Sequence, residues 1–122
     1  MQIDVVAGRA MTIASGRRGR RPWLSLLSAV LDLAGGKAEL LRHSERPWAS
    51  ATFAGTRHVI ALSFPGEEGA AAAEAFMEAL PEHEFAIPGQ MVADAAIAAV
   101  EHDVGPSPHL TVEIEMLLLE EA

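Results

Sequence analysis

The pattern of apolar and polar positions is clearest near the C-terminal end, between Leu110 and Leu119. Apolar residues occupy alternate positions in this segment: Leu110, Val112, Ile114, Met116 and Leu118. A period of two is typical of a strand with one buried face, because successive side chains point to opposite sides. Leu117 and Leu119 interrupt the otherwise polar second face, so we expect that end of the second face to be covered as well.

The middle of the chain predicts a three-stranded meander. Segments 48–54 and 57–64 form the clearest hairpin, with Gly55-Thr56 as its turn, because a glycine at the first central position suits a type II′ turn. In the second arm, one face carries His58, Ile60, Leu62 and Phe64. A strand at 38–43 and a turn at 44–47 precede this hairpin, and connections this short require antiparallel neighbours.

Two helices are predicted in the first two thirds of the chain. The first runs from Trp23 to Ala34, with Pro22 at its beginning and Gly35-Gly36 after its end. The second helix stops at Pro81, a residue that cannot continue it. Its apolar stripe consists of Ala73, Phe76, Met77 and Leu80.

The remaining segments complete the predicted order of elements. Residues 3–6 and 11–13 predict a broken strand, and the Gly- and Arg-containing residues 14–21 predict a loop. A short strand is expected at 85–87, and the apolar spacing between Gln90 and His102 predicts a third helix.

These elements follow the order β-α-β-β-β-α-β-α-β. We therefore predict a single α+β domain over residues 1–122. Its sheet should be mixed and mostly antiparallel, with two to three helices packed on it in two layers, as a ferredoxin-like variant.

Composition narrows the class of protein. Half of the residues are apolar, which supports a packed core, and the absence of Cys excludes disulfides and thiolate metal sites. No apolar run reaches the roughly 18 residues of a membrane span, and the first residues lack the layout of a signal peptide. We therefore expect a cytoplasmic protein that does not bind membranes. The net charge of −8 disfavours nonspecific binding of nucleic acid, although the basic half of the chain keeps a local exception open.

The charge is distributed very unevenly along the chain. Residues 1–57 hold all nine Lys and Arg against four acids, a formal charge of +5. Residues 58–122 hold thirteen acids and no Lys or Arg. An acidic half without counter-charges would repel itself, so we expect basic groups of the first half, of another copy or of a partner to face it.

Four arginines cluster just before the first predicted helix: Arg17, Arg18, Arg20 and Arg21. Positive side chains at a helix start oppose the helix dipole, and a bound anion or an acidic surface would relieve that repulsion. We therefore predict that this cluster binds an anion or a partner.

Two histidines are candidates for a pocket. His58 shares its strand face with apolar residues, and His83 lies between two glutamates that could raise its basicity. A further polar group has the residue types of a metal site but not the spacing: Glu101, His102, Asp103 and His109. We assign no metal, no cofactor and no catalytic residue, because no nucleophile motif is present.

These observations support two functions. The first is a small non-catalytic interaction module that self-associates, as a homodimer, or docks on a protein partner through complementary charge. In a two-fold dimer, the arginines of one copy would meet the acids of the other. The alternative is a binding domain or enzyme with a pocket between sheet and helices, in which the arginines hold an anionic ligand and His58 or His83 is the base.

Overall fold

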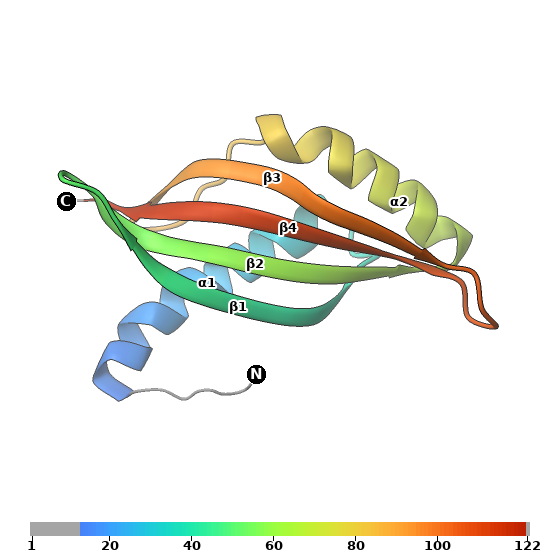
Figure 1. The fold of residues 1–122 in the computed structure, drawn as a ribbon, viewed down its shortest axis with the longest axis horizontal. Coiled ribbons are helices and arrows are strands. Elements are labelled where there is room, and N and C mark those ends of the chain that lie inside the picture. The colour runs from blue at the N-terminus through green and yellow to red at the C-terminus, as the bar shows by residue number, and fades with distance from the viewer. Residues whose placement is uncertain (1–12, 122) are drawn as a thin grey trace.

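The structure, a computed structural model, describes the backbone of residues 13–121 and the side chains of residues 22–121. The elements are α1 (Ile13–Leu33), β1 (Glu39–Ala49), β2 (Ala54–Pro65), α2 (Gly66–Ala79), a 3₁₀ turn (Leu80–Glu82), β3 (Gln90–Asp103) and β4 (His109–Glu120). The strands form one antiparallel sheet in the order β1-β2-β4-β3. Both helices lie against one face of this sheet, which confirms an α+β fold with a helical layer on a sheet (Figure 1).

The core forms between that sheet face and the two helices. Its fully buried residues come from both helices, the 3₁₀ turn and the two central strands: Leu26, Val30, Ile60, Leu62, Phe64, Ala73, Phe76, Leu80, Val112, Ile114, Met116 and Leu118. The predicted apolar faces of the second hairpin arm and of the last strand are therefore confirmed. The stripe of α2 is also confirmed, and Pro81 lies in the 3₁₀ turn where that helix ends.

Leu117 and Leu119 lie on the sheet face that the helices leave open. They are only 8% and 6% exposed within a single copy. Other residues of the same chain therefore cover these two side chains. This end of β4 leaves little apolar surface for a second copy to cover.

The first hairpin turns at a different place from the one predicted. Strand β1 continues through residues 44–47, and the turn spans Ser50 to Phe53, where the Ser50 N–H donates to the Phe53 carbonyl over 2.8 Å. Gly55 lies inside β2, at a point where a Cβ atom would stand 2.0 Å from the Leu118 carbonyl oxygen. This glycine therefore allows the close approach of β4 and does not make the turn.

The third predicted helix is wrong, because residues 90–103 form strand β3. Two register shifts, between Val92 and Asp94 and between Ile97 and Ala99, interrupt its pairing with β4. The half-buried residues that pack on the core are consequently Val92, Ala95 and Ile97, with spacings of three and two. Bulges of this kind give a strand an apolar spacing that resembles a helix, and Ala-rich composition strengthens that resemblance. The predicted short strand at 85–87 is reduced to a single bridge between Ile87 and Gln90.

The predicted loop at 14–21 is also wrong, since α1 begins at Ile13 and Pro22 lies inside it. The helix ends where expected, at Gly35 and Gly36, which both have φ of 72°. The predicted strand at 3–6 and 11–12 lies outside the described residues.

The predicted fold class is confirmed in part. The described sheet is antiparallel throughout, where a mixed sheet was expected, and the described residues form two helices. The ferredoxin-like arrangement is not confirmed, because the described elements follow the order α-β-β-α-β-β and not β-α-β-β-α-β.

Candidate functional site

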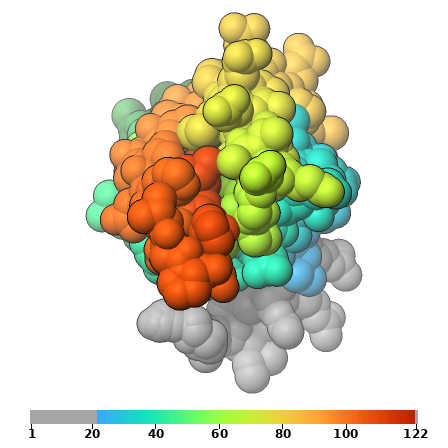
Figure 2. Space-filling model, turned by 90° about the vertical axis from the view of Figure 1, so that its right-hand side faces the viewer, coloured from blue at the N-terminus to red at the C-terminus, as the bar shows by residue number. Residues whose placement is uncertain are grey.

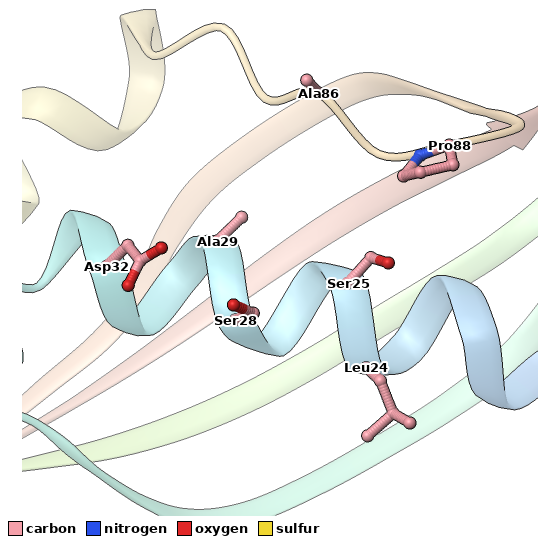
Figure 3. A pocket seen from close by; sticks show the side chains of 7 residues that line it. All are labelled: Leu24, Ser25, Ser28, Ala29, Asp32, Ala86 and Pro88. Carbon is pink, nitrogen blue, oxygen red and sulfur yellow. The ribbon is translucent and has the colours of Figure 1, made fainter.

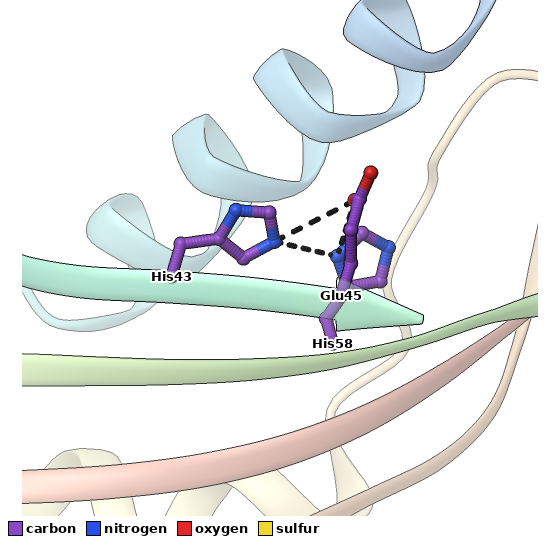
Figure 4. Close-up of polar contacts among 3 residues, drawn as sticks. All are labelled: His43, Glu45 and His58. Atoms are coloured by element: carbon purple, nitrogen blue, oxygen red, sulfur yellow. Dashed lines mark hydrogen bonds and ion pairs between the residues drawn. The ribbon is translucent and has the colours of Figure 1, made fainter. Parts of the chain in front are cut away.

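The structure brings His43, Glu45 and His58 together on the core side of the sheet. His43 and Glu45 are two residues apart on β1, so their side chains point to the same face. His58 is the register partner of Glu45 on β2. The three side chains converge beneath α1 (Figure 4).

The donor atoms of this His–Glu–His cluster are close to one another. His43 Nε2 lies 2.9 Å from His58 Nδ1. The Glu45 Oε2 atom lies 3.4 Å from His58 Nδ1 and 3.7 Å from His43 Nε2. When the two rings bond each other directly, one of these two nitrogens must carry the proton and the other must accept it.

Trp23 of α1 closes the cluster from the helix side. Its ring is stacked on His43 with the ring centroids 3.5 Å apart and the planes 7° from parallel. The His58 side chain is 4% exposed, that of His43 is 16% exposed and that of Glu45 is 47% exposed. The cluster is therefore reached from solvent on its Glu45 side.

Burial determines the charge of both rings. It lowers the pKa of His43 to about 4. Burial, with the repulsion of a protonated His43 as a smaller cause, lowers the pKa of His58 to about 3. Both imidazoles are consequently neutral near pH 7, the form in which a histidine nitrogen can accept a hydrogen bond or bind a metal ion.

The other predicted site residues are not part of this cluster. His83 is exposed and contacts Phe85 edge-on, with ring centroids 4.5 Å apart. His109 lies 3.9 Å from Asp103 at the turn between β3 and β4. Among the residues whose side chains the structure describes, only His43, Glu45 and His58 offer three donor atoms within 4.8 Å of one another.

The pocket predicted between sheet and helices is not found in the described part of the chain, because core side chains fill that space. A hollow of about 450 Å³ lies instead on the outer side of α1, against the 86–88 segment (Figure 3). Its polar lining consists of Ser25, Ser28 and Asp32. A carboxylate with no cation beside it in that lining does not suit an anionic ligand.

Three cations of the first half pair with acids of the second half inside one copy. Lys37 Nζ lies 2.8 Å from Glu68 Oε1, and this pairing raises the pKa of Lys37 and lowers that of Glu68. Arg42 lies 3.1 Å from Glu113. Arg57 lies 3.7 Å from Glu115. Part of the expected compensation between the two halves of the chain is therefore internal.

The sequence-based prediction included His58 but missed its partners. The misplaced turn at Gly55-Thr56 would pair His58 with Phe53, whereas the actual turn pairs it with Glu45. The sequence did contain a signal for the cluster. His43 and Glu45 are two residues apart on one face of a strand, and His58 lies on the strand that pairs with it. The arginines at 17, 18, 20 and 21 lie in the first half of α1, so the argument from a helix start does not apply to them.

Comparisons with known proteins identify a similar fold. No protein-family profile matches the chain, and no curated protein matches its sequence. A chain in a solved structure titled as the virion of a native gene transfer agent particle is similar, with a TM-score of 0.58 and 13% identity. The match covers 89% of this chain and 99% of that one. At this level of identity, the likeness shows the fold alone.

Proposed function

We propose that this chain is a non-catalytic interaction module that associates with further copies of itself through surfaces of opposite charge. The separation of charge in the fold carries this proposal. The basic first half supplies α1 and the edge strand β1, and the acidic second half supplies α2 and the opposite edge strand β3.

The two charged regions lie at opposite sides of the molecule. The first turns of α1, whose sequence includes four arginines, extend past the β1 edge of the sheet (Figure 1). At the other side, α2 and the turn between β3 and β4 lie next to each other (Figure 2). Apart from Glu68, which pairs with Lys37, the exposed acids of α2, the 3₁₀ turn and the end of β3 are Glu67, Glu74, Glu78, Glu82, Glu101 and Asp103. The arginine-containing turns and the acidic elements therefore lie on different sides, where each can meet a different neighbour.

This placement favours head-to-tail association over the two-fold dimer. An isologous contact brings the same surface of both copies together, so a contact at either charged side would oppose like charges. A heterologous contact joins the basic side of one copy to the acidic side of the next. Such contacts build rings or filaments.

The comparison with solved structures supports a role in an assembly. The similar chain is a component of a virion, which contains many subunits. An interaction module with this fold is compatible with that setting. No helix in the described part of this chain is long and apolar enough to cross a membrane.

Replacing Arg17, Arg18, Arg20 and Arg21 together with Gln tests the basic side. At low salt, we expect the variant to associate much more weakly than the wild type. We also expect association of the wild type to weaken at 1 M salt, where the Debye length is about 3 Å. Sedimentation velocity over a concentration series measures both effects. Arg42→Gln is the control, because that guanidinium already pairs with Glu113 inside the chain.

Unchanged association of the four-arginine variant would contradict a role of this segment in self-association. If phosphate raises the unfolding temperature of the wild type but not of this variant, while both remain monomeric, the arginines bind an anion instead. Association only in the presence of a second protein would identify a different partner.

A further inference from the structure

The His–Glu–His cluster contains the residue types of a metal site. Neutral imidazole nitrogens and a carboxylate are common ligands of first-row divalent cations, and two histidines with one carboxylate recur in zinc and iron sites. His43 Nε2, His58 Nδ1 and Glu45 Oε2 supply this set from two adjacent strands.

The separations of the donor atoms fit a single bound ion. Ligand bonds of about 2.0–2.2 Å in tetrahedral geometry place neighbouring donor atoms about 3.3 Å apart. The three observed separations are 2.9, 3.4 and 3.7 Å, which bracket that value. All three donor atoms are therefore close enough to one another to share one ion.

The surroundings hold the two histidines in place. Trp23 is stacked on His43 and restricts rotation of its ring, while the buried His58 is fixed in the sheet between β1 and β4. Glu45 is half exposed, so an ion can enter and leave from its side. Rigid ligands on regular elements favour a defined site over adventitious binding by mobile side chains.

We propose that His43, Glu45 and His58 bind one divalent cation of the Zn²⁺ class. The ion would join the edge strand β1 to β2 directly beneath Trp23. This proposal is independent of the proposed function, since the cluster faces the core and the self-association surfaces do not include it.

The experiment uses the full chain without an affinity tag, stripped with EDTA and titrated with Zn²⁺ by calorimetry. We expect saturable binding of about one ion per chain. Co²⁺ should bind at the same site and show the visible absorption bands of a low-coordinate complex. His43→Gln, His58→Gln and Glu45→Gln should each weaken Zn²⁺ binding by at least the roughly 10–100-fold that loss of an outer-shell partner causes.

The controls are matched in chemistry. His83→Gln and His102→Gln remove exposed histidines outside the cluster, and Glu39→Gln removes a carboxylate from the same strand. All three should bind Zn²⁺ like the wild type. Glu45→Gln keeps the test decisive if the His58 variant fails to fold, because Glu45 lies largely outside the core. Absence of saturable binding in the wild type, or equally tight binding by the folded Glu45→Gln variant, would overturn the proposal.

Discussion

Ile114→Ala is expected to reduce the free energy of unfolding by about 2–5 kcal/mol, the range for truncating a fully buried aliphatic side chain. Ile114 is 0% exposed on the central strand β4. Its register partners are Ile60 on β2 and Ile97 on β3, so the isoleucine lies in the middle of a row that crosses three strands. Strands on both sides limit how far the sheet can collapse into the space left behind.

Denaturant unfolding measures this loss at equilibrium. The matched control is Val104→Ala, since Val104 is 75% exposed in the turn between β3 and β4. That change should alter stability by less than about 0.5 kcal/mol. A loss below about 1 kcal/mol for Ile114→Ala would mean that this face of β4 does not form the core.

Gly55→Ala is expected to destabilise the chain by about 3 kcal/mol or more, although it adds a single methyl group. The new Cβ would stand 2.0 Å from the Leu118 carbonyl oxygen and 3.0 Å from two further backbone atoms. Backbone atoms of a paired central strand cannot move aside without breaking the ladder between β2 and β4. Overpacking of a rigid site typically costs about 1–3 kcal/mol, and backbone contact places this change at or above the upper end.

Gly105→Ala is the control for this prediction. Its added Cβ would meet only the Asp103 side-chain oxygen, at 3.2 Å, and its backbone needs no positive φ. We expect a change of less than about 1 kcal/mol in the same denaturant series. Equal unfolding midpoints for the two alanine variants would show that β4 does not approach β2 as closely as described.

The sequence contained enough information to predict the elements whose pattern is regular. The alternation in β4 identified Val112, Ile114 and Met116 as core residues, because an uninterrupted strand keeps a period of two. The end of α1 was also predictable, because paired glycines are a local signal. In both cases, the residues that determine the structure are neighbours along the chain.

The errors have a common physical origin in contacts between distant segments. The β3 segment was mistaken for a helix because bulges against β4 change its apolar spacing. Gly55 was placed in a turn because its steric role depends on Leu118, which is far away in sequence. The His–Glu–His cluster was missed for the same reason, since it depends on the register of β1 against β2.

We expect the basic side of one copy to bind the acidic side of the next copy. The most direct test mixes the four-arginine variant with a variant in which Glu67, Glu74, Glu78 and Glu82 are replaced by Gln. Each variant retains one of the two proposed surfaces, so each alone should remain monomeric. In a mixture, the intact acidic side of one variant can bind the intact basic side of the other, and the resulting complex cannot extend further.

Sedimentation velocity at low salt gives the result. We predict that the wild type forms species larger than a dimer, and that the equimolar mixture forms only one-to-one heterodimers. A wild type that remains monomeric at high micromolar concentration, or a mixture that sediments like its separate components, would contradict the account.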